Sequence, residues 1–91
     1  MEAIFILTIE DYLDRDIVLA TTNVEKVAKA YVDARRVDDP MIEIYTEEEG
    51  WIATYQEIQK SPKKVEESII NILNKNEIKT KTKKKENKGD L

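Results

Sequence analysis

The feature that most constrains the fold of this chain is a change of hydrophobic period that occurs twice along its 91 residues. Runs rich in apolar and β-branched residues, which favour strands, cover residues 3–9, 16–21, 41–46 and 51–57. Apolar residues at helical spacing cover residues 23–36 and 62–75. The order ββαββα predicts an α+β fold in which two helices pack on one face of a four-stranded, mixed but mostly antiparallel sheet.

The connections add detail to this prediction. A polar loop joins the first two strands, and Gly50 provides a residue free to take a positive φ in the turn after residues 47–49. The second and third strands are joined through a helix, so we expect them to run parallel, with a right-handed crossover, if they are neighbours. The first loop and the later turn would then lie at opposite ends of the sheet.

Both helices begin at sequence signals. Thr22 is predicted to be the N-cap of the first helix, with Glu25 completing a capping box. Ser61 followed by Pro62 predicts the start of the second helix. The first helix is expected to bury one apolar stripe, formed by Val24, Val27, Ala28, Tyr31 and Val32.

Charge is divided unevenly along the chain. Residues 1–59 carry 5 Lys+Arg against 14 Asp+Glu, whereas residues 60–91 carry 10 Lys against 5 acidic residues. This division predicts one acidic domain at residues 1–76 and a disordered, lysine-rich tail at residues 77–91. The lysines that would give the tail a weak electrostatic attraction for phosphate groups are Lys79, Lys81, Lys83, Lys84, Lys85 and Lys88.

The composition argues against enzyme chemistry. The chain has no cysteine and no histidine, so it lacks a thiolate nucleophile, the commonest general base and the commonest transition-metal ligand. With 2 glycines it has little material for a phosphate-binding loop. We therefore expect a protein without catalytic residues, cofactor or metal. No segment has the pattern of a signal peptide or the length of a membrane span, which favours a cytoplasmic location.

The first strand–loop–strand–helix segment resembles a group of small proteins encoded by bacteriophages and prophages. The resemblance covers Ile4-Phe5-Ile6-Leu7-Thr8, an acidic and aromatic loop, Ile17-Val18-Leu19-Ala20-Thr21-Thr22 and Glu25-Lys26-Val27-Ala28-Lys29-Ala30-Tyr31. In that group a short hairpin runs into a helix with a T-x-x-E-K-A type of start, followed by a further strand. The resemblance implies an accessory protein of a phage or mobile element, and such small acidic proteins often bind and inhibit a host protein.

The acidic loop between the first two strands is one candidate binding site. Its aromatic and apolar residues, ringed by carboxylates, suit a basic-rimmed pocket on a protein partner, and the residues concerned are Tyr12, Leu13 and Asp14. Calcium binding by Glu10, Asp11, Asp14 and Asp16 is an alternative, although the spacing is not that of an EF-hand. A simple solvated loop is a third alternative.

The turn between the last two strands is a second candidate. Three successive carboxylates there could imitate phosphate groups on a DNA-mimic surface, and these are Glu47, Glu48 and Glu49. Asp38, Asp39 and Glu43 would extend such a surface. The alternative is a polar turn that keeps the sheet edge from pairing with other chains.

The sheet face not covered by helices is a third candidate. If Ile42, Ile44, Ile52 and Thr54 face the core, alternation places on the open face Glu43, Tyr45, Trp51, Ala53 and Tyr55. An open face with Tyr and Trp suits a host-protein contact or a homodimer contact. The alternative is that Trp51 belongs to the core and that Tyr45 and Tyr55 form the interface. We therefore expect a protein-binding module that inhibits or redirects a host protein, with weak nucleic-acid binding through the lysine-rich tail as the alternative.

Overall fold

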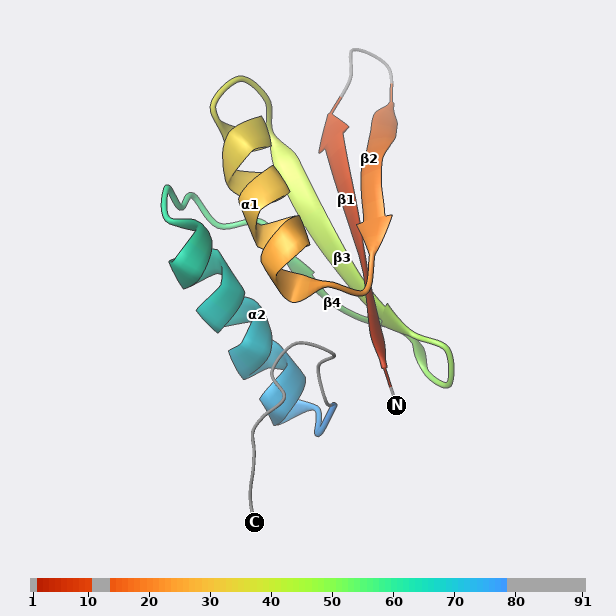
Figure 1. Ribbon diagram of the computed structural model, residues 1–91. Helices are drawn as coiled ribbons and strands as arrows, with labels where there is room; N and C mark the ends of the chain where they lie inside the picture. The colour runs from red at the N-terminus through yellow and green to blue at the C-terminus, as the bar shows by residue number, and fades with distance from the viewer. Residues whose placement is uncertain (1, 11–13, 79–91) are drawn as a thin grey trace.

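The structure is a computed structural model that describes residues 2–10 and 14–78. Its elements follow the predicted order ββαββα (Figure 1). The strands are β1 (Ala3–Glu10), β2 (Arg15–Thr21), β3 (Pro40–Thr46) and β4 (Gly50–Tyr55). The helices are α1 (Val24–Arg35) and α2 (Pro62–Lys75). The predicted α+β class is confirmed. The predicted disorder of the tail concerns residues that, from Lys79 onward, lie outside the described part of the chain.

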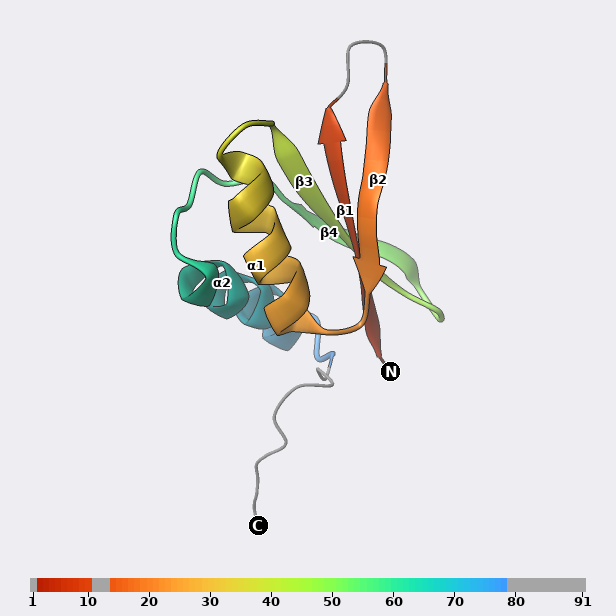
Figure 2. The same ribbon diagram turned by 45° about the horizontal axis from the view of Figure 1, so that its top comes forward.

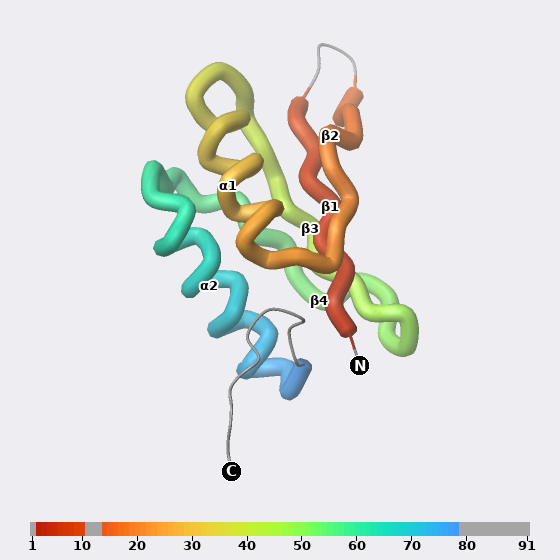
Figure 3. The backbone as a smooth tube through the Cα atoms, in the orientation of Figure 1, coloured from red at the N-terminus to blue at the C-terminus, as the bar shows by residue number. Residues whose placement is uncertain are grey.

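The four strands form one sheet in the order β2-β1-β3-β4, and all three pairings are antiparallel. The prediction of a mixed sheet is wrong, because β1 lies between β2 and β3 and separates the two strands that run in the same direction (Figure 3). The β1–β2 hairpin and the β3–β4 turn lie at opposite ends of the sheet, as predicted (Figure 1).

Both helices lie on one face of the sheet (Figure 2). The core between the layers is formed by alternate residues of β1 and β3 and by the apolar stripes of α1 and α2. Its largest fully buried side chains include Phe5, Leu7, Tyr31, Ile44 and Ile69. The stripe predicted for α1 is buried, with Val32 partly exposed at its end.

The first helix begins one residue later than predicted. Asn23, not Thr22, is the N-cap, because its backbone is extended and its Oδ1 accepts the Lys26 N–H at 3.0 Å. The predicted capping box between Thr22 and Glu25 is therefore wrong. The preceding Thr21 hydroxyl accepts the Asn23 N–H at 3.1 Å, which holds the chain at the strand–helix junction.

Replacing Asn23 with alanine is expected to destabilise the protein by about 1 kcal/mol, because the Lys26 N–H loses its acceptor. Replacing Thr22 with alanine is the matched control and should cost less than half as much. Urea denaturation of both variants, followed by circular dichroism, measures the difference. Equal losses would show that the two residues share the capping role.

The second helix ends in a Schellman motif that carries the fold past the predicted boundary. Glu77 takes a φ of 58°, the Ile78 N–H donates to Leu73 O at 2.8 Å, and the Glu77 N–H donates to Asn74 O at 3.1 Å. Ile78 is consequently buried. The residue was predicted to lie in the solvated tail, whereas it packs in the same core as Leu73.

A β-bulge in β4 changes which side chains face the helices. Ile44 pairs with Ala53 and Tyr45 pairs with Trp51, so Ile52 is an extra residue without a partner on β3. Trp51 therefore lies on the open face and not in the core, which was the alternative placement. Tyr55 does not: it pairs with Ile42 on the core face and is buried. The bulge likewise turns Ala53 toward the core and leaves Thr54 exposed, the reverse of the prediction.

In the core, Tyr55 forms an edge-to-face pair with Tyr31 of α1, with ring centroids 5.2 Å apart. The Tyr31 hydroxyl donates to Glu57 O, which fastens α1 to the segment that leads from β4 to α2. The buried Tyr55 hydroxyl makes no hydrogen bond within the described residues. Ser68 is near enough to oppose the rise in pKa that burial causes at Tyr55, but their geometry is not that of a hydrogen bond.

These two tyrosines should respond differently to the loss of their hydroxyl groups. Tyr31→Phe is expected to lower the free energy of unfolding by about 1 kcal/mol, because a hydrogen bond is lost. Tyr55→Phe should be neutral or slightly stabilising, because it removes a buried hydroxyl without a partner. Chemical denaturation distinguishes them, and a larger loss for Tyr55→Phe would contradict the hydrogen-bond assignment.

Stability should fall in strong alkali. Burial raises the pKa of Tyr31 to about 12, with the Arg35 charge opposing the shift. The folded pKa of Tyr31 lies above the unfolded value of about 10. The protonated hydroxyl therefore makes its full contribution to the free energy of unfolding below pH 10, and this contribution is lost as the pH rises toward 12. Unfolding free energies measured across this range should decline less steeply in Tyr31→Phe. An identical decline in both proteins would remove Tyr31 as a cause.

Candidate protein-interaction surface

The side of the sheet that faces away from the helices is here called the open face. Strand pairing places on it the residues Ile4, Ile6, Thr8, Ile17, Ala20, Met41, Glu43, Tyr45, Trp51 and Thr54. No helix or strand of the described chain covers this side (Figure 2). It is thus a continuous surface built on the rigid part of the fold.

Cross-strand pairing arranges the open face in three rows. The row nearest the β3–β4 turn holds Ile4, Tyr45 and Trp51. The middle row holds Ala20, Ile6, Glu43 and Thr54. The row nearest the β1–β2 hairpin holds Ile17, Thr8 and Met41. Because each row crosses three or four strands, apolar side chains extend over the whole sheet.

Large apolar side chains are strongly exposed on this surface. The exposed fractions are 57% for Trp51, 68% for Ile17 and 37% for Ile4. The pairing of β1 with β2 contains a second bulge, because Leu7 pairs with Leu19 and Thr8 pairs with Ile17. Val18 is the extra residue of this bulge and is 50% exposed. A face of this kind is typical of a protein contact, because a partner that covers it removes apolar surface from water.

The polar groups of the open face hydrogen-bond to one another. The Tyr45 hydroxyl donates to Glu43 Oε1 at 2.7 Å, and Trp51 Nε1 donates to Thr54 Oγ1 at 3.0 Å. The bond to Glu43 raises the pKa of Tyr45 above its ordinary value. Both aromatic residues are therefore held in place before a partner arrives, which lowers the entropy lost on binding.

The hairpin end of the open face is more polar. Arg15 Nε donates to the Thr8 hydroxyl at 3.0 Å, and a second nitrogen of the guanidinium donates to Asp39 O at 2.9 Å. Arg15 also lies 3.9 Å from a Glu10 carboxylate oxygen. These contacts connect β2 to the start of β3 across β1. The Arg15 guanidinium is therefore engaged in contacts within the protein.

The structure brings together some of the predicted site residues and separates others. Glu43, Tyr45 and Trp51 meet on the open face, whereas Tyr55 is in the core. Tyr12 and Leu13 lie outside the described residues, and Asp14 at the hairpin is exposed. The predicted tail sites Lys79 to Lys88 also lie outside the described part of the chain.

The acidic residues proposed for a DNA-mimic surface are not gathered in one patch. Glu47, Glu48 and Glu49 are exposed in the turn after β3, whereas Asp38 and Asp39 precede the start of that strand. A strand of this length separates the two groups by about 20 Å. Asp39 is also paired with Arg35 at 3.0 Å. Glu43 lies on β3 between the two groups, and the acidic residues are spread along the strand instead of forming one cluster.

Sequence reasoning missed the apolar half of the open face, contributed by Ile4, Ile6, Ile17 and Met41. The signal was present, because the β1 segment was predicted to carry apolar residues on both faces. That pattern was interpreted as cover on both sides of a central strand. Among residues 2–10 and 14–78, cover is provided to the face with Ala3, Phe5 and Leu7 and not to the opposite one.

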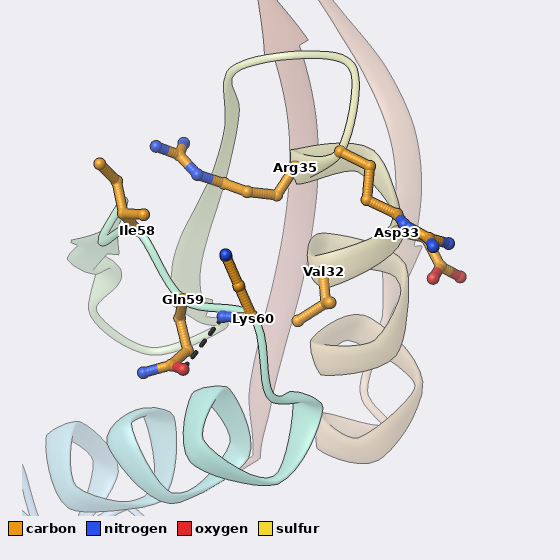
Figure 4. A pocket seen from close by; sticks show the side chains of 7 residues that line it. Val32, Asp33, Arg35, Ile58, Gln59 and Lys60 are labelled. Carbon is orange, nitrogen blue, oxygen red and sulfur yellow. Dashed lines mark hydrogen bonds between the residues drawn. The ribbon is translucent and has the colours of Figure 1, made fainter.

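A separate hollow of about 590 Å³ lies between the end of α1 and the segment before α2 (Figure 4). Its lining residues are Val32, Asp33, Arg35, Arg36, Ile58, Gln59 and Lys60. Arg35 extends across it toward Ile58 but is held by Asp39, and Asp33 offsets one of the two remaining cations, Arg36 and Lys60. None of the predicted site residues lines this hollow, and its charges do not favour one class of ligand.

Within residues 2–10 and 14–78 no cluster of three or more acidic side chains has the arrangement needed to hold a metal ion. In that same part of the chain no helix combines the length and the apolar character needed to cross a bilayer.

Comparisons of the chain with protein-family models, with curated proteins and with solved structures give no match. Function is therefore inferred from the open face itself.

Proposed function

We propose that this chain is a protein-binding module whose contact surface is the open face. The observation that carries the proposal is the exposure of Trp51, Ile17 and Ile4 on one side of a sheet whose other side packs against the helices. Rigid aromatic anchors surrounded by apolar residues are the usual source of binding energy in protein interfaces.

The biological setting that we propose is that of a phage or mobile-element accessory factor that inhibits or redirects a host protein. The hairpin-to-helix resemblance supports this setting. The acidic character of the folded part also supports it, since the described residues carry 9 Lys+Arg against 16 Asp+Glu. A surface of that sign attracts basic proteins and repels nucleic acid.

The second candidate function is weak nucleic-acid binding through the lysine-rich tail. The six lysines at 79, 81, 83, 84, 85 and 88 favour it. Binding of this kind depends on counterion release, so it weakens steeply as salt increases.

Affinity capture from a bacterial lysate, with the full chain and with a version ending at Ile78, separates the two functions. The shorter version keeps every core residue of the described part of the chain, because Ile78 is itself part of that core. Retention of the same protein partner by both versions at raised salt supports the module. Loss of all binding on removal of the tail, or tight nucleic-acid binding by the shorter version, would contradict it.

A further inference from the structure

Glu43 is the one carboxylate that lies in the middle row of the open face. Its cross-strand neighbours are Ile6 on β1 and Thr54 on β4, and its own strand places Met41 and Tyr45 on either side. The side chain is half-buried among these residues. A charge at the centre of an apolar contact surface is costly to cover unless the partner supplies a counter-charge.

Glu43 has only part of its hydrogen-bonding capacity used. One oxygen, Oε1, accepts the Tyr45 hydroxyl at 2.7 Å. Within the described residues no Lys or Arg forms an ion pair with Glu43 and no donor reaches its second oxygen. The carboxylate is thus held by Tyr45 through one oxygen, and its acceptor sites on the other oxygen remain available.

A second copy of the chain does not satisfy this carboxylate. An isologous contact brings the same face of both copies together, so both Glu43 carboxylates would be covered by rows that hold no Lys or Arg to neutralise them. Two like charges brought into a desolvated contact oppose association. The acidic excess of the described residues, 16 Asp+Glu against 9 Lys+Arg, adds to this repulsion.

We infer that the open face recognises a different, basic protein surface, which places one Arg or Lys side chain against Glu43 within an otherwise apolar contact. The apolar rows on either side would exclude water from this pair. The inference depends on the proposed function, since it names the partner chemistry of the same face.

The test uses a display library of a small helical scaffold with one randomised surface, selected on the immobilised full chain and counter-selected on Trp51→Ala. Selected binders are expected to carry Arg or Lys among apolar residues. Their affinity should fall at least about 30-fold for Glu43→Gln, because the partner's cation is left buried without a counter-charge. The amide oxygen that Glu43→Gln introduces can still accept the Tyr45 hydroxyl bond, so the variant should keep the arrangement of the face.

Glu67→Gln, an exposed change on α2, is the matched control and should alter affinity by less than twofold. Binders that depend on Trp51 but tolerate Glu43→Gln would overturn the inference while leaving the proposed function intact. Failure to select any binder that depends on Trp51 would count against both. Sedimentation of the free chain should show a monomer, and a dimer that Trp51→Ala dissociates would also overturn the inference.

Discussion

Replacing Phe5 with alanine is expected to lower the free energy of unfolding by about 3–5 kcal/mol. Phe5 lies in the middle of β1, pairs with Ile44 on the core face and is only 1% exposed. Its removal leaves a cavity between the sheet and the helices that the surrounding side chains fill only in part. For a domain of this size the melting temperature should fall by roughly 15–30 °C.

Ile4→Ala is the matched control, because the neighbouring residue lies on the opposite face of the same strand. Because 37% of the Ile4 surface is exposed, Ile4→Ala should lower the free energy of unfolding by about 1 kcal/mol or less. Thermal unfolding followed by circular dichroism measures both variants. Equal losses would mean that the helices do not cover the face that holds Phe5.

Replacing Trp51 with alanine should have the second large effect, on binding and not on folding. The side chain is 57% exposed and its nitrogen donates to the exposed Thr54, so the stability should change by less than about 1 kcal/mol. Affinity for a partner should fall at least about 30-fold, as expected for an aromatic residue that anchors an interface. Calorimetric titration with the captured partner measures this loss.

Val37→Ala is the control for exposed apolar area. Val37 is 83% exposed, but it follows α1 and does not belong to the open face. If non-specific hydrophobic association governs binding, Trp51→Ala and Val37→Ala should weaken it to a similar degree. If the open face governs it, Val37→Ala should bind as the unmodified chain does.

The order of helices and strands could be predicted because the hydrophobic period indicates both the type of element and its buried residues, as at Val24, Val27 and Tyr31. The strand order could not, because apolar residues on both faces of β1 predict a central strand without naming its neighbours. The N-cap was misplaced by one residue because Thr22 and Asn23 are both suitable caps, and only the backbone geometry decides between them.

The candidate site could be predicted only in part, and the reason is local. Strict alternation places Tyr55 on the same face as Trp51, but the bulge at Ile52 reverses the alternation between them. Periodicity holds no signal for an extra residue in a strand. Similarly, the burial of Ile78 depends on the positive φ of Glu77, which no glycine marks in the sequence.

The most direct test of the open face as the binding surface uses the fluorescence of Trp51, the only tryptophan in the chain. Acrylamide should quench it readily in the free protein, because the side chain is 57% exposed. In a complex with a captured partner that lacks tryptophan, we expect strong protection from quenching and a blue-shifted emission. Unchanged quenching in a saturated complex would contradict the account, because the partner would then bind elsewhere.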